Sequence, residues 1–563
     1  MAPAYAAFAF HVGEGLKQTE ERGRINMLHA LTRRALLTAT AAGLLTLAGS
    51  YGPALAKTPK DVLVVADKID DLISLDPAEM FEFSAYDYAQ NVYDRLITFD
   101  PKNFGPLKPG VAESWSLADD GVTYTFKIRK GLKFHSGNPL TAHDVVYSLR
   151  RAVKLKKTPS FILTQFGFTP ENVDEKIKAL DDYTVQIVTN KPYAPSFVYN
   201  CLTAPIAGIV DSKLLKEHEK DGDFGNGWLK THSAGSGAYK LRVWKPNEIY
   251  VLDRAGDYWR GKVAMKAVFV RHIEESSSQR LLLEKGDVDV ARKLTPDDIA
   301  AVMKNPDLKV ENDLKGRIMY FALNQKHPIL SKPKVREAFR YLADYEGMTK
   351  SFLRGQYVVH QAFLPLTYLG ELKEKPYTLN IEKARALLKE AGHGDGFSVK
   401  IYVRNAQDRL EIAQSLQNTF AKVGIKAELV VGTGKQILTE YRARKHEIYL
   451  GAWGPDYPDP HTNADSFAHN PDNRDEAKLT GKLAWRNSWF NPEVNKMTEA
   501  AVLEKDTAKR AEMYRELQRK VQREGPYVIM FQQIIQSAMR KNVNGFITGG
   551  AISQVHYWTV TKD

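Results

Sequence analysis

Residues 397–431, FSVKIYVRNAQDRLEIAQSLQNTFAKVGIKAELVV, decide the fold class of this chain. Apolar and polar side chains alternate from Phe397 to Val403 and again from Ile425 to Val431, which is the period of a half-buried strand. Between these two segments apolar residues recur every three or four positions, and Gly424 ends the pattern, as expected of a helix. A strand, a helix and a strand of this length place the two strands parallel in one sheet. The sequence therefore predicts an α/β fold.

The next apolar stretch, residues 447–460 (EIYLGAWGPDYPDP), changes character halfway. Its first half predicts a short buried strand, and the glycine and three prolines of its second half cannot continue one. Asp456 therefore follows the carboxyl end of a strand, where open α/β sheets bind ligands, and Trp453 and Tyr457 flank it. An acid between two aromatic side chains suits a cationic amine. The alternative is that Asp456 only caps its own turn.

Two arginines belong to the same predicted edge. Arg404 ends its strand, and Arg409 opens the following helix. If residues 447–453 join the sheet in parallel, Asp456 emerges on the same edge as Arg404, so one anion and one or two cations lie on one rim of a cleft. Such a rim fits a small zwitterion, since each charge-assisted hydrogen bond contributes about 1.5–3 kcal/mol. The alternatives are that the arginines lie on the surface or pair with Asp408 or Asp456 itself.

The composition excludes several classes of protein. A chain of 563 residues is too long for one core, so two or three domains are expected. The net charge of +12 is dispersed rather than gathered in a stripe, so no nucleic acid is expected as a partner. The only cysteine, Cys201, excludes an internal disulfide and a thiolate metal cage, and it is predicted to be a small buried residue.

Other candidate chemistry is weak. Residues 432–435 (GTGK) follow a strand but lack the spacing of a phosphate-binding loop, and His461 and His469 lack a recognised metal-ligand spacing. We therefore expect no cofactor and no metal.

The first 56 residues are predicted to be an export signal. Arg33 and Arg34 precede an Ala-rich apolar run, and Ala54-Leu55-Ala56 has the form of a cleavage site, so we expect cleavage after Ala56. The paired arginines are similar to a twin-arginine signal, while the general secretory route and an uncleaved anchor are alternatives. Met27 would start a signal of ordinary length as an alternative to Met1. No later apolar run reaches the roughly 20 residues needed to span a bilayer, so a soluble periplasmic protein is expected.

Residues 107–149 contain the most distinctive pattern of the chain, LKPGVAESW, then DDG, VTYTFKIR and KGLKFHSGNPLTAHDVVYSL. This segment resembles the signature of the family 5 extracellular solute-binding proteins. Further stretches in the same order carry the resemblance to the C-terminus: GSGAYKL (235–241), DYWRG (257–261), LEKGDVDVA (283–291), FALN (321–324) and VREAFRYLAD (335–344).

The resemblance implies the two-lobe periplasmic-binding-protein fold of the large class, with an extra subdomain and a ligand cleft between lobes that close by a hinge motion. It implies four segments: the export signal 1–56, a first lobe 57–314 with an extra subdomain at about 100–230, a second α/β lobe 315–533, and a C-terminal return to the first lobe at 534–563.

The resemblance also implies a role. The chain would be the non-catalytic binding component of an ABC importer of di- or oligopeptides, a monomer that docks on permease subunits served by cytoplasmic ATPase subunits. In peptide-binding relatives an Asp three residues after a Trp holds the amine, which is the spacing of Trp453 and Asp456. The segment of Phe81 and Phe83 corresponds in position to one that lies along the ligand.

Alternatives remain at this stage. The cargo could be an opine, an oligosaccharide or a metal chelate. Leu450 stands where some oligopeptide binders carry an arginine, which argues against long peptides. An exported hydrolase is a rival for which the sequence offers no nucleophile and base, and an exported peptide chaperone is another.

Overall fold

The computed structural model describes residues 58–100, 103–256, 258–548 and 555–563. The predicted export signal, residues 1–56, lies outside the described residues. Within the described ranges, no helix combines the length and the apolar character needed to cross a membrane.

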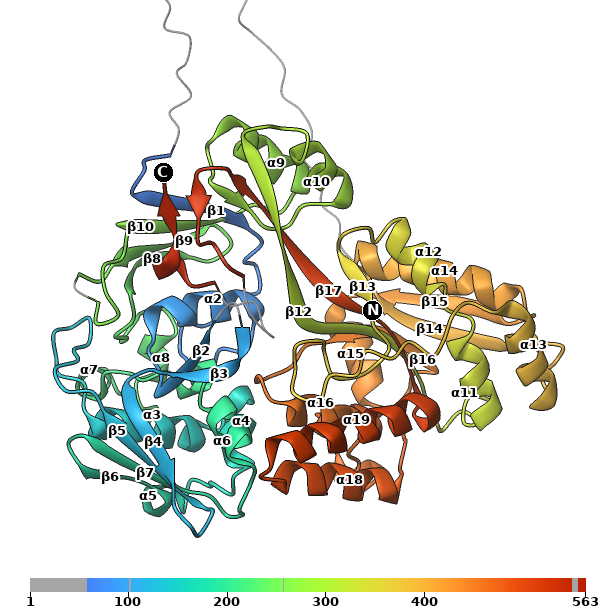
Figure 1. Cartoon of the computed structure of the whole chain (residues 1–563), viewed down its shortest axis with the longest axis horizontal. Coiled ribbons are helices and arrows are strands. Elements are labelled where there is room, and N and C mark those ends of the chain that lie inside the picture. Colours follow the sequence, from blue (N-terminus) through green and yellow to red (C-terminus); the bar gives the residue numbers. More distant parts are fainter. Residues whose placement is uncertain (1–57, 101–102, 257, 549–554) are drawn as a thin grey trace, which may run out of the picture. The chain divides into compact units, whose positions relative to one another are not determined.

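An eleven-stranded sheet runs through the molecule, in the order β15-β14-β16-β12-β17-β11-β1-β10-β9-β8, with β13 paired to β17 (Figure 1). Its strands are β1 (Val62–Asp67), β8 (Tyr239–Lys245), β9 (Ile249–Arg254), β10 (Ala267–His272), β11 (Val290–Ala291), β12 (Leu308–Leu323), β13 (Tyr357–Val359), β14 (Ser398–Arg404), β15 (Lys426–Gly432), β16 (Ile448–Trp453) and β17 (Tyr527–Arg540). We call β8–β11 and β1 the first half of the sheet and β14–β16 the second half.

The long antiparallel strands β12 and β17 join the two halves. Residues 308–314 of β12 pair with the end of β17 that also pairs with β11, and residues 318–323 pair with both β17 and β16. The register shifts between Leu314 and Ile318. An irregularity of this kind bends a strand, so Lys315, Gly316 and Arg317 form the bend between the two halves.

The second half has the predicted topology. β14 pairs in parallel with β15 and with β16, and its bounds agree with the predicted strand within one residue. Successive residues of β12 enter two different apolar clusters, one containing Phe321 and the other Tyr320. Both faces of this half are therefore covered by helices: α11 (Pro333–Arg340), α12 (Tyr345–Lys350), α13 (Ile381–Glu390), α14 (Gln407–Ala421), α15 (Gly434–Arg442), α16 (Pro460–Phe467), α17 (Leu483–Arg486), α18 (Pro492–Leu503) and α19 (Thr507–Glu524).

Side-chain caps and a left-handed glycine mark the ends of several helices. The Asn380 side chain accepts a hydrogen bond from the backbone N–H of Lys383, and Gly392 beyond α13 has a left-handed backbone with φ +79°. At the start of the helix Ala142–Leu155, Thr141 and Asp144 form a reciprocal capping box. Such caps satisfy the N–H groups that a helix start leaves without a partner.

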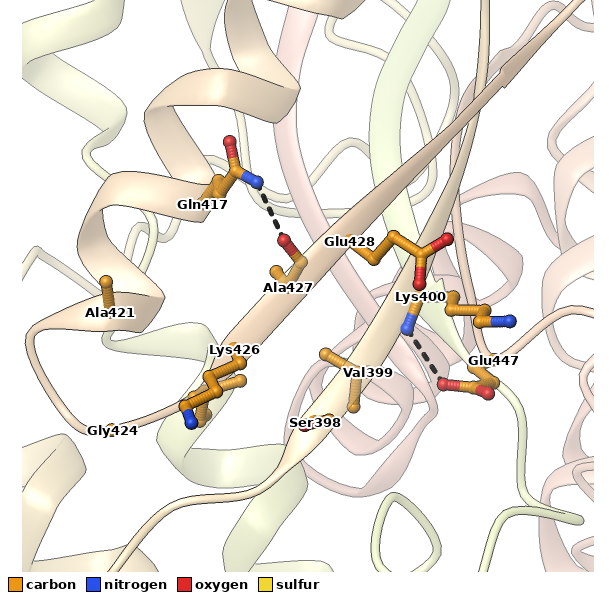
Figure 2. A pocket seen from close by; sticks show the side chains of 11 residues that line it. Ser398, Val399, Lys400, Gln417, Ala421, Gly424, Lys426, Ala427, Glu428 and Glu447 are labelled. Carbon is orange, nitrogen blue, oxygen red and sulfur yellow. Dashed lines mark hydrogen bonds between the residues drawn. The ribbon is translucent and has the colours of Figure 1, made fainter.

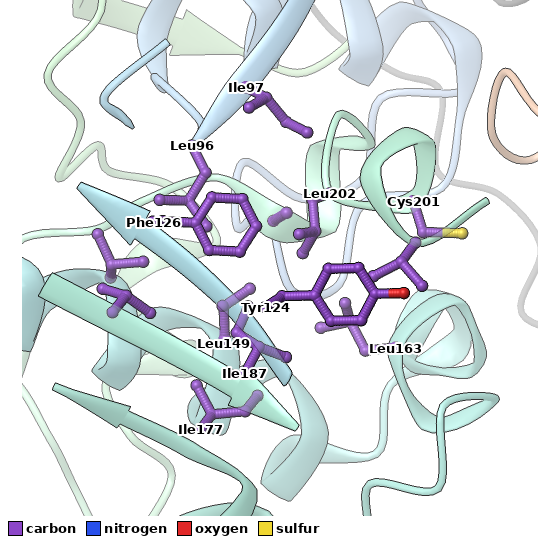
Figure 3. Packing of buried hydrophobic residues seen from close by; sticks show 14 of the residues in the cluster. Leu96, Ile97, Tyr124, Phe126, Leu149, Leu163, Ile177, Ile187, Cys201 and Leu202 are labelled. Atoms are coloured by element: carbon purple, nitrogen blue, oxygen red, sulfur yellow. The ribbon is translucent and has the colours of Figure 1, made fainter. Parts of the chain in front are cut away.

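A separate four-stranded sheet, β4-β5-β7-β6, lies between β3 and β8 in the sequence. Its strands are antiparallel and pack on α3 around an apolar cluster that includes Tyr124, Phe126 and Leu149 (Figure 3). Cys201 is fully buried in this cluster, which confirms the prediction for this residue. The elements here are β4 (Ala112–Leu117), β5 (Thr123–Ile128), β6 (Ile177–Asp181), β7 (Thr184–Val188), α3 (Ala142–Leu155), α4 (Phe161–Thr164), α5 (Val173–Lys176) and α6 (Pro195–Cys201).

The remaining elements cover the first half of the sheet and the connections. They are α2 (Phe83–Val92), α7 (Ser212–Glu217), α8 (Asn226–Leu229), α9 (Ser276–Lys285), α10 (Pro296–Val302), the hairpin β2 (Ile97–Asp100) and β3 (Asn103–Pro109), the pair β18 (Val543–Asn544) and β19 (Thr561–Lys562), and the 3-10 turns η1 (Thr158–Ser160), η2 (Pro205–Ala207), η3 (Asp475–Ala477) and η4 (Tyr557–Thr559).

The glycines of the 235–237 turn allow this turn to approach the end of α2. A Cβ atom on Gly235 would lie 1.9 Å from the backbone carbonyl oxygen of Val92. We expect Gly235→Ala to destabilise the protein by about 1–3 kcal/mol, because the backbone must move to relieve the overlap. Urea denaturation measures this change. Gly481→Ala is the control, since a Cβ there meets no atom within 4 Å. Equal stability of the two variants would contradict the prediction.

Candidate functional site

Asp456 lies in the turn that follows β16, at the same edge of the sheet as the end of β14. Its carboxylate is partly buried and accepts a long hydrogen bond, 3.5 Å, from the Thr462 hydroxyl. Among the described residues, no lysine, arginine or histidine nitrogen lies within 4.0 Å of this carboxylate. Burial raises the pKa of Asp456 to about 7. Asp456 is therefore a partly buried carboxylate without a direct ion-pair partner among the described residues.

The turn is held by Thr462 at the start of α16. The backbone N–H of Asp456 donates to the Thr462 hydroxyl over 3.1 Å. The cap of α16 is Asp459, whose side chain accepts from the backbone N–H of His461. Asp459 rather than Asp456 is thus the cap of α16, and the alternative of a purely local role for Asp456 stands beside the binding role, since the contact of its carboxylate is with Thr462 of the same segment.

Two tyrosines that the sequence analysis did not single out stand near Asp456. Burial raises the pKa of Tyr86 in α2 well above its ordinary value, and the nearby Asp456 charge adds to this shift. The same holds for Tyr368, beside Asp459 and Asp456. Tyr86 and Tyr368 pack together with Phe81, one of the predicted residues. The side chain of Phe83 lies outside the described part of the structure.

Trp453 ends β16, opposite Ile318 of β12. Its ring is partly buried and meets Phe467 edge to face at 6.3 Å. The indole N–H is buried and has no hydrogen-bond acceptor among the described residues. Trp453 therefore offers one unsatisfied donor three residues before Asp456.

Tyr457 is used in packing. It is buried, its ring lies 5.8 Å from that of Phe197 in α6, and its hydroxyl donates to Gln165 over 3.3 Å. These contacts join the turn after β16 to the four-stranded-sheet region. In this conformation the Tyr457 ring packs on Phe197 and its hydroxyl bonds Gln165. A direct role of Tyr457 in ligand binding stays a prediction.

Arg404 is exposed at the end of β14, and its guanidinium lies over Gly434 at the start of α15. It has no ion-pair partner among the described residues. The Lys68 amine, which Glu274 holds at a raised pKa, is close enough for the Arg404 charge to oppose part of this shift. Because Lys68 follows β1 and Arg404 ends β14, the Arg404 charge acts on a residue of the first half of the sheet.

Arg409 is buried in the first turn of α14, and its Nε has no acceptor among the described residues. Burial lowers its pKa, and the charge of Arg317 lowers it further. The neighbouring Asp408 accepts instead from the Tyr357 hydroxyl over 2.8 Å. The alternative that Arg409 pairs with Asp408 is therefore not realised.

The bend between the halves carries two cations that the sequence analysis missed, Lys315 and Arg317. Both line a cavity of about 120 Å³ with residues that follow β1 and β11. Their sequence, KGR inside an otherwise ordinary strand pattern, gives no signal unless β12 is known to bend there.

A different depression, of about 680 Å³, lies at the opposite ends of β14 and β15 (Figure 2). Its polar groups are used locally: Glu447 accepts from the backbone N–H of Lys400, and Gln417 donates to the Ala427 carbonyl. It contains none of the predicted site residues. Within the described ranges, no three His, Cys, Asp or Glu side chains gather as a metal site.

Comparisons with known proteins identify the family of the chain. Residues 106–475 match the model of the bacterial extracellular solute-binding proteins, family 5. The chain is 29% identical over 515 residues to the probable D,D-dipeptide-binding periplasmic protein DdpA of Escherichia coli K12, covering 91% of this chain and 96% of the relative. It is 25% identical over 500 residues to the glutathione-binding protein GsiB of Shigella boydii, covering 86% and 92%.

A solved structure has the same fold. The periplasmic binding protein DppA of Helicobacter pylori, in complex with the peptide STSA, superposes with a TM-score of 0.73 at 24% identity and covers 89% of this chain and 98% of its own. The two halves joined by β12 and β17 are thus the two lobes of a periplasmic-binding-protein fold, as predicted. Since the family model matches more than half of its length, the chain belongs to the bacterial extracellular solute-binding proteins of family 5, which bind substrates rather than convert them.

Proposed function

We propose that this protein is the periplasmic binding component of an ABC importer and that its cargo is a di- or short oligopeptide. The observation that carries the proposal is the Asp456 carboxylate, which is partly buried beside the first-lobe residue Tyr86 and has no cationic partner among the described residues. The ammonium of a peptide would supply that partner through charge-assisted hydrogen bonds. The named relatives bind peptides or glutathione, which supports the same class of cargo.

The terminal carboxylate of the peptide would bind the arginines at the same edge of the sheet. Arg404 and Arg409 have no carboxylate partner among the described residues, and a bidentate arginine suits a terminal carboxylate. Trp453, Phe81 and Phe83 would line the cleft.

The proposal extends to the domains and the partners. The first lobe is 57–314 with the extra subdomain at about 100–230, the second lobe is 315–533, and 534–563 return to the first lobe. The bend of β12 after Leu314 and the pairing of the end of β17 with β11 support this division. The mature monomer, cleaved after Ala56 and exported by the twin-arginine or the general route, would deliver its cargo to permease subunits and catalyse no reaction.

Isothermal titration calorimetry tests the cargo. We expect alanyl-alanine or another unmodified dipeptide to bind at one site per chain. A parallel fluorescence titration should show a change in intrinsic fluorescence that Trp453→Phe removes. The same titration with an opine, an oligosaccharide and a metal chelate should give no heat. Binding of one of these in place of the dipeptides would transfer the transport role to that solute, and slow conversion of a bound peptide would indicate an enzyme.

The affinity for a dipeptide should depend on pH. An ammonium binds only the ionised carboxylate, and the pKa of Asp456 is raised to about 7, so affinity should rise as the pH increases toward 7. It should fall again above about 8, where the peptide amine loses its proton. The folding stability of the unliganded protein should have the opposite pH dependence. A raised carboxyl pKa means that the folded state holds the extra proton, so its stability declines as the pH rises from about 4 to 7.

Calorimetry and urea denaturation across this pH range check both trends, and Asp456→Asn should remove them. A wild-type affinity that stays flat between about pH 5.5 and 7.5 would contradict the assignment of the amine to Asp456.

A further inference from the structure

The bend of β12 contains a buried lysine, Lys315, whose amine has no partner among the described residues. Lys315 is only 3% exposed, and its Nζ has no hydrogen-bond or ion-pair partner among the described residues. Burial lowers its pKa to about 7. A buried charged group without a partner is costly, so such a group is rarely retained without a use.

The acids near Lys315 are already engaged. Asp313 accepts hydrogen bonds from the backbone N–H and the hydroxyl of Thr548. Asp67 and Asp87 both pair with Arg292. Pairing within the protein therefore leaves no carboxylate for the Lys315 amine in this conformation.

The cavity that Lys315 lines has an excess of positive charge. Its walls carry five basic and three acidic side chains: Lys68, Arg292, Lys293, Lys315 and Arg317 against Asp67, Asp71 and Asp87. Burial raises the pKa of Asp71, whose carboxylate accepts a hydrogen bond from the Ser84 hydroxyl. A cavity of about 120 Å³ has room for a carboxylate and one or two methylene groups, since a water molecule takes about 30 Å³.

The cavity lies within reach of the Asp456 site. Ser84 and Asp87 of α2 line it, and Tyr86 of the same turn stands near Asp456. Lys315 precedes Ile318, the partner of Trp453, by three residues, which is at most roughly 10 Å because β12 bends between them. This distance matches a dipeptide with an extended side chain, because each residue spans at most about 3.5 Å.

We propose that Lys315, supported by Arg317, binds a second carboxylate of the cargo, so that the protein prefers peptides with an acidic side chain or an equivalent extra carboxylate. This inference rests on the proposed function and deepens it: Asp456 holds the ammonium, the rim arginines hold one carboxylate, and the cavity at the β12 bend holds the other. A carboxylate there would give Lys315 the charged partner that it lacks.

Two nearly isosteric peptides test the proposal. We expect wild-type protein to bind alanyl-glutamate at least about tenfold more tightly than alanyl-glutamine, because only the former brings a second charge. Lys315→Met should reduce this ratio to about one and leave the affinity for alanyl-glutamine within about twofold. Lys315→Gln gives the same information if the methionine variant does not fold. Lys400→Met, an exposed lysine at the other end of β14, is the matched control and should keep the wild-type ratio.

The outcomes separate the two levels of the argument. If both peptides bind wild type equally, or if Lys315→Met keeps the wild-type ratio, the second-carboxylate site is wrong while the peptide role stands. If Lys315→Met weakens both peptides by the same factor, Lys315 holds the terminal carboxylate and the inference is again overturned. If neither peptide binds wild-type protein, the proposed function itself fails.

Discussion

Replacing Asp456 with asparagine should weaken the binding of a dipeptide by roughly 100-fold or more. Two charge-assisted hydrogen bonds to an ammonium contribute about 1.5–3 kcal/mol each, and asparagine offers only one neutral acceptor in their place. The unliganded variant should be at least as stable as wild type near neutral pH, since it removes an ionised group whose pKa burial has raised. Calorimetry with alanyl-alanine measures the first effect and urea denaturation the second.

An N-acetylated dipeptide is the control for this prediction. It lacks the ammonium, so wild-type protein should bind it about as weakly as the variant binds the free peptide. Asp456→Asn should no longer distinguish the two peptides. Equal affinities of wild type and variant for the free peptide would remove Asp456 from the binding site.

Replacing Asp459 with asparagine should have the largest effect on stability, a loss of about 3–5 kcal/mol. Asp459 and Arg510 form a bidentate pair with N–O distances of 2.7 and 2.9 Å, and both side chains are at most 1% exposed. Arg510 also donates to Ser196 of α6, so the same group ties the second lobe to the four-stranded-sheet region. Asparagine can still cap α16, but it leaves the Arg510 charge buried without its counter-charge.

The double variant Asp459→Asn, Arg510→Met is the control, because it removes the stranded charge and should recover most of the lost stability. Urea denaturation of the two variants and of wild type decides the matter. A single variant within about 1 kcal/mol of wild type would mean that Arg510 finds another partner or reaches water.

Local patterns predicted the second lobe well. The alternation of residues 397–403 and 425–431 and the stop at Gly424 are each decided by neighbours in the sequence, and β14, β15 and the helix α14 between them follow within two or three residues. β16 pairs in parallel with β14, which is the condition under which the sequence placed Asp456 on the same sheet edge as Arg404.

The contacts between distant segments were not predictable in the same way. β12 pairs with β17 across about two hundred residues, and only this pairing makes Lys315 part of a bend instead of an exposed strand residue. Tyr86 and Tyr368 meet near Asp456 from opposite lobes, and nothing in their local sequence marks them. The packing of Tyr457 against Phe197 and its hydrogen bond to Gln165, both remote in the chain, were likewise not predictable from its local sequence.

Peptide binding in the proposed mode depends on one contact, between the Asp456 carboxylate and the ammonium of the cargo. A crystal structure of the protein with a bound dipeptide tests it most directly. We predict the ammonium nitrogen at about 2.7–3.0 Å from an Asp456 carboxylate oxygen, with the peptide carboxylate toward Arg404 or Arg409. A peptide whose ammonium lies elsewhere, with Asp456 still bound only to Thr462, would contradict the account.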